Sequence, residues 1–223
     1  MADQFLNLNG ARIVAGTIMI PLYGLWAGDV SLAGDQAMPD RVTLTLGNLT
    51  MKGAVYRQAT FAGTRYVRLV GGMGGWHKTL PRKTYVQLGG LQLSTVLRDA
   101  AAEVAEQLNI PSGVDRVIGQ RWVREELPGA RILRQVYGMN WHVDVAGVTQ
   151  LAPWPAKTIT SPFQVTKQDG GRGIIEVATE DYASWMPGVS FTSTTLTGTY
   201  KAGSVSLKFE ASGTARLEVM TYG

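Results

Sequence analysis

Cysteine is absent from this chain of 223 residues, which excludes disulfide bonds, thiol nucleophiles, iron–sulfur clusters and cysteine-ligated zinc. Histidine is nearly absent as well, because His77 and His142 are the only two. They lie far apart, and neither has a second ligand beside it at the spacing of a metal-binding helix. A metal site needs several convergent ligands, so we expect neither a metal nor a cofactor.

Long apolar segments are also missing from the sequence. No apolar run approaches the roughly 20 residues that a membrane-spanning helix needs. The N-terminus lacks the basic region and the following apolar stretch of a secretory signal. We therefore expect no membrane segment and a protein that is made in a cytoplasm.

Charged side chains are scarce, at 17% of residues against about a quarter in ordinary globular proteins. The 21 lysines and arginines only slightly outnumber the 17 acidic residues. The arginines are scattered along the chain. Examples are Arg65, Arg68, Arg82, Arg121, Arg124, Arg131 and Arg134. A sequence-independent DNA-binding protein concentrates its positive charge in a patch, so this pattern indicates solvated surface charge. A sparsely charged surface with 27 glycines for turns favours contacts with other proteins.

Nucleotide and hydrolase motifs are not found either. Glycines cluster over residues 71–75, but Trp76 and His77 come before Lys78, no helical pattern begins there, and the spacing of a dinucleotide-binding loop fails too. We expect a flexible or tightly turning interface loop at this point. The Gly-x-Ser-x-Gly elbow of serine hydrolases is also missing.

A close pair of carboxylates would suffice for glycoside cleavage, so the acidic residues need separate consideration. The candidates are Glu125, Glu126, Glu176, Glu180 and Asp181. Adjacent residues of a strand point to opposite faces, and no positional signature marks a pair, so solvated turns explain these residues equally well. We predict that the protein is not an enzyme, and we assign no catalytic residue.

Short segments with the period of a β-strand dominate the chain. In residues 1–90 the expected strands are 11–22, 29–33, 41–46, 52–59 and 64–70. A hairpin turn is expected over residues 61–64. Later strands are expected at 141–145, 148–151, 173–178, 189–196, 205–209 and 215–221. Many short strands with polar turns predict a barrel or a sandwich.

Two segments have the period of a helix instead. Apolar residues spaced three and four apart predict a helix over 93–108, capped by Ser94 or Thr95 and stopped before Pro111. Its polar face carries Arg98, Asp99, Glu103 and Glu106. A shorter helix is predicted over 129–137, with Gly138 as its left-handed terminator.

The fold class expected from these segments is mainly β with a small α portion. We predict two β-barrel or sandwich-like modules with a helical insertion between them. Residues 1–90 would form the N-terminal β module, 91–140 the helical insertion and 141–223 the C-terminal β module. The proline-bearing segment 153–162 is expected to be a linker or a strand edge.

Six tryptophans are spread along the chain and fit either a β core or a protein interface. Trp76, Trp154 and Trp185 lie in loop-like segments near glycine or proline. We predict these three and His77 as interface residues, while Trp141 lies in a strand pattern and belongs to the core.

Several stretches carry a family resemblance. They are residues 16–33 (GTIMIPLYGLWAGDVSLA), 42–46 (VTLTL), Gly53, 71–76 (GGMGGW), 97–107, 141–145 (WHVDV) and 186–189 (MPGV). Together they resemble hub or baseplate proteins of tailed bacteriophages, related to the T-even baseplate hub and to the spike hub modules of type VI secretion. The resemblance spans most of the chain, and its positions are glycine, proline and aromatic residues with structural roles.

The resemblance implies a structural virion protein of a phage tail that is assembled in the host cytoplasm. In such families, two barrel-like modules per subunit form a trimeric ring with pseudo-sixfold symmetry between the tail tube and the tip. It therefore implies a homo-oligomer, with a trimer favoured, that contacts tail tube proteins and tip or fibre proteins. DNA would pass through the ring without specific binding. The chain is short for this family, which leaves limited room for extra domains.

Two other functions fit the sequence. A carbohydrate-binding, receptor-recognition β module of a tail tip would use exposed tryptophans, such as Trp76 and Trp154, to stack on sugar rings. A peptidoglycan hydrolase would use a pair of the carboxylates named above. The host, the ring symmetry and the surfaces that meet each neighbour stay open at this point.

Overall fold

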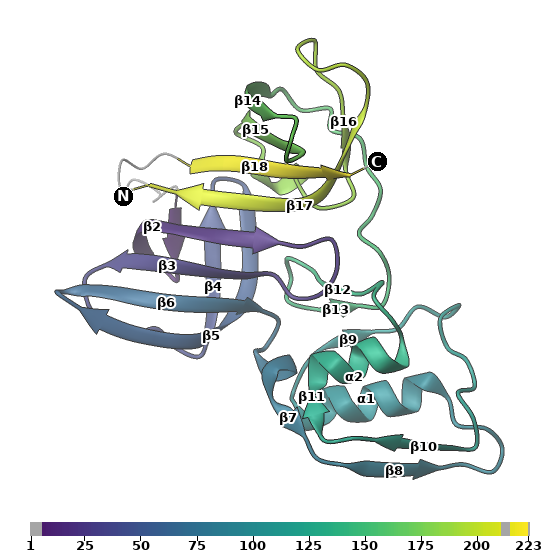
Figure 1. Ribbon diagram of the computed structural model, residues 1–223. Helices are drawn as coiled ribbons and strands as arrows, with labels where there is room; N and C mark the ends of the chain where they lie inside the picture. Colours follow the sequence, from purple (N-terminus) through teal and green to yellow (C-terminus); the bar gives the residue numbers. More distant parts are fainter. Residues whose placement is uncertain (1–5, 211–214, 223) are drawn as a thin grey trace.

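The computed structural model describes residues 6–210 and 215–222 and is mainly β, with 47% strand and 12% helix (Figure 1). The first strands are β1 Leu6–Leu8, β2 Ala11–Ile20, β3 Ala27–Ala33, β4 Arg41–Leu46, β5 Leu49–Phe61 and β6 Thr64–Gly71. The middle holds η1 Gly75–His77, β7 Thr79–Leu80, β8 Lys83–Val86, α1 Leu93–Glu103, β9 Leu108–Asn109, β10 Arg121–Arg124, β11 Leu127–Pro128, α2 Gly129–Val136, β12 His142–Val143 and β13 Thr149–Gln150. The last elements are β14 Gln164–Asp169, β15 Ile174–Ala178, η2 Tyr182–Ser184, β16 Ser190–Phe191, β17 Tyr200–Phe209 and β18 Ala215–Tyr222.

Six antiparallel strands close into a barrel in the order β1-β4-β5-β6-β3-β2, with β1 also paired to β2. The hairpin turn predicted over 61–64 is confirmed, because Phe61 pairs with Thr64 and both central residues have positive φ. Trp26 is buried against two glycines of the barrel. A Cβ would lie 2.5 Å from the Trp26 ring at Gly53 and 2.7 Å from it at Gly71, so only glycine leaves room for the indole.

The C-terminal strands do not form a second, separate module. The first residues of β2 pair with β1, while residues 16–20 pair with β17, and the sheet continues through β18, β15 and β14 (Figure 1). The expectation of two separate modules was therefore wrong. One six-stranded barrel carries the C-terminal strands as an extension of its sheet, while β7 to β13 pair in three small sheets. Ile18 faces Leu207 across this junction, and both are buried, so the shared apolar face joins the two regions.

Aromatic side chains fill the core behind the C-terminal strands. Phe163 meets the Trp185 ring edge-on with 5.0 Å between ring centroids, and Trp185 lies 5.1 Å from Phe191. Such edge-to-face and tilted pairs suit the charge distribution of aromatic rings. Trp185 is fully buried, so this cluster anchors the segment around η2 and β16 against the sheet.

The middle of the chain forms a smaller part with two helices, seen at the lower right of Figure 1. The apolar face predicted for the first helix is confirmed: Leu93, Val96, Leu97, Ala100 and Ala101 are all buried. The extent over 93–108 was wrong, since α1 ends at Glu103. The capping prediction was also wrong, because Gln92 is the N-cap, and Ser94 instead meets the Asp115 carboxylate through its backbone N–H and its hydroxyl.

The end of α1 has a specific geometry that the sequence pattern does not reveal. The backbone N–H of Glu106 donates to the Ala101 carbonyl at 2.8 Å, and that of Ala105 donates to the Ala102 carbonyl at 3.1 Å. This is the hydrogen-bond pattern of a Schellman cap. Ala105 takes the left-handed position with φ of 58°, where glycine is usual. The second helix was predicted well, because α2 ends at Val136 and Gly138 follows with φ of 109°.

Most predicted strands are present, but polar edge strands were missed. The expected strand at 189–196 is reduced to Ser190–Phe191. Two unpredicted strands, β10 and β14, contain few apolar residues, and Val165 is the one apolar side chain of β14. Strands at an edge need no apolar alternation, which removes the signal. The boundaries 1–90, 91–140 and 141–223 stay a prediction.

Candidate assembly surfaces

An open groove of about 550 Å³ lies on the barrel, over strands β2, β3, β5 and β6. Small residues line it, among them Ala15, Gly16, Ser31 and Ala59. Two β-bulges border the groove, one between Ile13 and Ala15 in β2 and one between Val55 and Arg57 in β5. Bulges bend a strand and increase its twist, so they help to hollow this face. The sequence did not predict the groove, because a β-bulge is defined by how two strands pair and the strand pairing is not visible in the sequence.

Two cross-strand rows supply the side chains of the groove. In one row, Ala15 pairs with Ser31, Ser31 with Tyr66 and Tyr66 with Ala59. Tyr66 is 49% exposed. In the other row, Asp29 pairs with Arg68, and Arg68 pairs with Arg57. The groove thus combines an apolar lining with a rim that carries more positive than negative charge.

The glycine-rich loop over residues 71–75 holds a carboxylate, and that carboxylate belongs to the chain itself. Glu106 is 7% exposed, and its Oε1 accepts hydrogen bonds from the backbone N–H groups of Gly75 at 2.6 Å and Trp76 at 3.3 Å. Its Oε2 accepts a third from Met73 at 3.0 Å. Burial raises the pKa of Glu106, while the three N–H donors oppose that rise.

This arrangement corrects one expectation and agrees with part of another. Glu106 was placed on the polar face of a helix, but it is buried beyond the end of α1. The tight turn expected of the glycine loop is present, since Gly72 and Gly74 have left-handed backbones, while its role at an interface stays a prediction. Amide clusters of this kind bind anions, and here the site is already filled.

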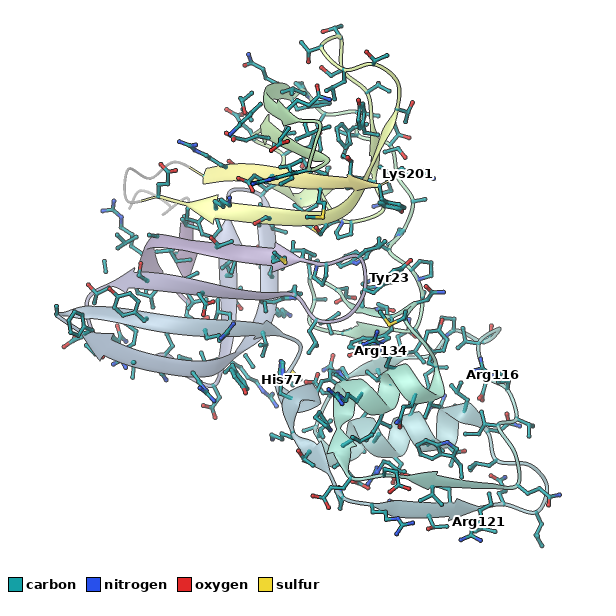
Figure 2. The ribbon with its side chains drawn as sticks, in the orientation of Figure 1. Tyr23, His77, Arg116, Arg121, Arg134 and Lys201 are labelled. Carbon is teal, nitrogen blue, oxygen red and sulfur yellow. The ribbon has the colours of Figure 1, made fainter. Side chains whose placement is uncertain are left out.

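Trp76 and His77 follow the glycine loop and differ in exposure. Trp76 is fully buried, and its indole N–H donates to the Thr149 hydroxyl at 2.7 Å. His77 is exposed (Figure 2). Its ring centroid lies 5.0 Å from that of Tyr56. Partial burial, together with the positive charge of Arg68, lowers the pKa of His77. An interface role for His77 stays a prediction.

Trp154 and Trp185 are also inside the chain. Trp154 is 7% exposed, its ring stacks on His142 with 4.0 Å between centroids, and its N–H donates to the Pro21 carbonyl at 3.2 Å. Large indole rings lose most by facing water, and neighbouring segments of the chain cover all three. The rings of Trp76, Trp154 and Trp185 are therefore covered within the single chain, and an interface role for these residues stays a prediction. The carbohydrate-binding interpretation loses its stacking platforms for the same reason.

A cavity of about 460 Å³ lies beside Trp154, between the β4–β5 hairpin and the segment around η2. Leu49, Val145 and Met186 line it together with Trp154. The hairpin is fixed here because the Asn48 amide donates to Asp181 at 2.7 Å and accepts from the backbone N–H of Ala183 at 3.1 Å. These two hydrogen bonds therefore hold the β4–β5 hairpin to the segment around η2 beside the cavity.

Arg124, which the sequence placed among the solvated arginines, is fully buried. Its guanidinium donates to Glu103 at 2.6 Å, to the Pro81 carbonyl at 3.1 Å and to the Tyr85 hydroxyl at 3.1 Å. Lys83 binds Glu103 at 3.0 Å on the same side of α1. A buried cation needs such partners, so this network attaches α1 to β8 and β10 and is structural.

Three of the five acidic residues considered for catalysis have separate partners. Glu125 lies 3.5 Å from Arg82, Glu176 lies 4.0 Å from Arg216, and Asp181 binds Asn48. Within residues 6–210 and 215–222, no group of three or more histidine and acidic side chains is placed to hold a metal ion. Helices in the part of the chain that the structure describes are too short or too polar to cross a bilayer.

Known proteins share the fold of this chain but not its sequence. No protein-family model matches the sequence, and neither does any curated protein. The fold matches the Escherichia coli c3393 protein, a type VI secretion component that exhibits structural similarity to the T4 bacteriophage tail proteins gp27 and gp5, with a TM-score of 0.71 and 10% identity over 98% of this chain and 77% of that one.

Two tail proteins match as well. A tail protein of Neisseria meningitidis MC58 has a TM-score of 0.64 and 10% identity, covering 97% of this chain and 95% of that one. The 43 kDa tail protein of prophage MuSo2 from Shewanella oneidensis has a TM-score of 0.63 and 8% identity, covering 97% of each chain. Over nearly its whole length, this chain has the fold of phage tail proteins and of a type VI secretion component.

Proposed function

We propose that this protein is a non-enzymatic structural subunit of a phage tail, located in the virion and assembled in the host cytoplasm. It forms an oligomeric hub ring, with a trimer favoured, at the tail tip or baseplate. The ring joins the tail tube to tip or fibre proteins and leaves an axial passage for DNA. The observation that carries the proposal is the fold likeness to tail proteins over 97–98% of the chain.

The surface of the barrel supports an assembly role. The groove over β2, β3, β5 and β6 exposes a mainly apolar lining in the single subunit, at a free energy cost that a protein contact removes. We assign one subunit contact of the ring to this groove. Its small residues, such as Ala59 and Ser31, leave space for a side chain of the neighbouring subunit.

Light scattering coupled to size-exclusion chromatography tests the ring, and negative-stain microscopy tests the axial hole. We expect a stable oligomer, with trimers the main species, and a ring in projection. A strictly monomeric protein at high concentration that also ignores purified tail tube protein would contradict the proposal.

The Ala59→Arg variant tests the groove. A large charged side chain would fill the space that a neighbour needs, so we expect dissociation to monomers with little change in Tm. Ser112→Arg adds the same side chain to an exposed turn far along the sequence and should leave the oligomer intact. An unchanged oligomer in Ala59→Arg would place the subunit contacts elsewhere.

A further inference from the structure

Three arginines gather around α2. Arg131 and Arg134 are exposed and lie three residues apart, so they share one side of the helix. Arg116 approaches from the loop before β10, and its guanidinium donates to the Val136 carbonyl at the end of α2 at 3.3 Å. Figure 2 shows Arg116 and Arg134 beside this helix. The scattered arginines of the sequence thus include a local cluster.

The cluster has no counter-charge within the described chain. None of the ion pairs among residues 6–210 and 215–222 involves Arg116, Arg131 or Arg134. The neighbouring acid Asp115 binds the backbone N–H and the hydroxyl of Ser94. α2 itself contains no acidic residue. Like charges three residues apart on a helix repel each other, so Arg131 and Arg134 together lower the stability of the folded chain.

The dipole of α2 affects its arginines differently. Arg134 lies in the last turn, where a cation is favourable, and Arg116 binds a carbonyl there. Arg131 lies in the first turn, at the positive end of the dipole, where a cation is unfavourable. Arg131 therefore gains nothing from the helix dipole, and an anion bound from outside the chain would offset this unfavourable position.

Two exposed apolar side chains lie in segments close to α2. Met139 follows α2 and is 46% exposed, and Tyr23 is 38% exposed. Their segments meet, because the backbone N–H of Gly24 donates to the Trp141 carbonyl at 2.7 Å, two residues beyond Met139. Figure 2 shows Tyr23 on the same side of the molecule as Arg134. We define the α2 arginine surface as Arg116, Arg131, Arg134, Tyr23 and Met139.

The composition of the α2 arginine surface distinguishes between anionic partners. Tyrosine, methionine and arginine are the residues enriched at protein interfaces, where lysine is depleted. Contacts with nucleic-acid phosphates use lysine freely as well as arginine. The surface contains no lysine, so a protein partner fits it better than DNA does.

The acidic residues without a partner are scattered along the chain. Among the described acidic residues, only Asp35, Asp40, Glu126 and Glu180 take part in no ion pair or side-chain hydrogen bond. Asp35 and Asp40 share a loop with nearby Arg41 and Arg65, and the other two lie far apart in the sequence. These four do not form one acidic run in the sequence, which favours a different protein as the source of the carboxylates.

We infer that the α2 arginine surface binds a carboxylate-rich surface of a different protein in the assembly. The inference rests on the proposed function, because it assigns a contact between the hub subunit and a heterologous neighbour. The partner presents several aspartates or glutamates to the arginines and apolar atoms to Tyr23 and Met139.

Fluorescence anisotropy with the full chain and a labelled decaglutamate peptide tests the inference. We expect binding that weakens as salt rises. Arg131→Glu/Arg134→Glu should raise Kd at least about tenfold, because two attractive charges become repulsive. Arg12→Glu/Arg41→Glu makes the same charge change at two exposed barrel positions and should alter Kd by less than about twofold. An unchanged Tm in each variant excludes unfolding as the cause.

Three results would overturn the inference. They are no peptide binding at low salt, an equal loss of binding in the two double variants, and tighter binding of a duplex DNA of matching length than of the peptide. The oligomeric state of the same samples is measured separately by light scattering. A monomeric wild-type protein contradicts the ring, whereas a failure of peptide selectivity in an intact ring contradicts only the α2 contact.

Discussion

The carboxylate of Glu106 accepts a hydrogen bond of 2.6 Å from the backbone N–H of Gly75, which precedes it by 31 residues. Gly72 and Gly74 have left-handed backbones with φ of 79°. A Cβ at Gly72 would lie 2.6 Å from a carboxylate oxygen of Glu106, so glycine is required for this approach. The contact fixes the segment that leaves the barrel to the end of α1, and it therefore determines how the helical part is attached.

Removal of this carboxylate should destabilise the whole chain. In Glu106→Ala the N–H groups of Met73, Gly75 and Trp76 lose their acceptor, and we expect the free energy of unfolding to fall by about 3 kcal/mol. Glu106→Gln keeps one acceptor oxygen and should cost less, about 2 kcal/mol. Urea unfolding followed by circular dichroism measures both.

Glu126 provides the control, because it is exposed and takes part in no side-chain hydrogen bond or ion pair among the described residues. Glu126→Ala should change the free energy of unfolding by less than about 0.5 kcal/mol. Equal stability of Glu106→Ala and Glu126→Ala would mean that water satisfies the loop amides as well as the carboxylate does.

The cap of α1 predicts a stabilising substitution. Ala105 has φ of 58°, a conformation that costs an L-residue about 1 kcal/mol and glycine almost nothing. Ala105→Gly should therefore raise the free energy of unfolding by roughly 0.5–1 kcal/mol, and its Tm should rise. Ala102→Gly, within the helix and equally exposed, should lower stability by a similar amount. Opposite signs for two identical substitutions exclude a general effect of composition.

Local patterns in the sequence predicted the local structure well. The spacing of Leu93, Val96 and Leu97 located the buried face of α1, because helical periodicity survives in any tertiary context. The turn at Ala62 and Gly63 followed from the alternation of the flanking strands. The overall β class followed from the same alternation, summed over many segments.

Contacts between residues far apart in the sequence could not be predicted from these local patterns. The pairing of Ile18 with Leu207 joins residues at opposite ends of the chain, and alternation does not say which strands meet. Glu106 looked like any polar helix residue, since its role depends on amides of a distant loop. Trp76 and Trp154 seemed exposed because glycine and proline surround them, yet other segments cover both.

The junction between β2 and β17 predicts cooperative unfolding. Leu207 is buried between Ile18 of β2 and Leu217 of β18, so Leu207→Ala should cost about 3 kcal/mol. Because barrel and C-terminal strands share one sheet, calorimetry should show a single transition in the variant as in the wild type. Ser206→Ala alters the opposite face of β17 and should change stability by less than about 1 kcal/mol. Two separate transitions would contradict the shared core.

His142 gives the protein a pH dependence of known sign. The side chain is 3% exposed, stacks on Trp154, and has an Nδ1 atom 2.9 Å from the Ala152 carbonyl. Burial lowers the pKa of His142 below its ordinary value of 6.5. Above pH 6.5 the imidazole is mainly neutral in both the folded and the unfolded chain, so the full contribution of neutral His142 to the free energy of unfolding is present. As the pH falls below 6.5, the unfolded chain takes up a proton that the native chain resists, so stability decreases until the folded pKa is reached.

Urea unfolding between pH 8 and pH 5.5 measures this effect. We expect the wild type to lose stability over this interval and His142→Gln to lose less, since its side chain does not titrate. At pH 8 His142→Gln should be less stable than the wild type, because it lacks the ring that stacks on Trp154. The difference in free energy of unfolding between the two proteins should decrease towards pH 5.5. His77→Gln removes an exposed ring and retains His142, so it should keep most of the slope. A His142→Gln protein with the full wild-type slope would assign the pH dependence to other groups.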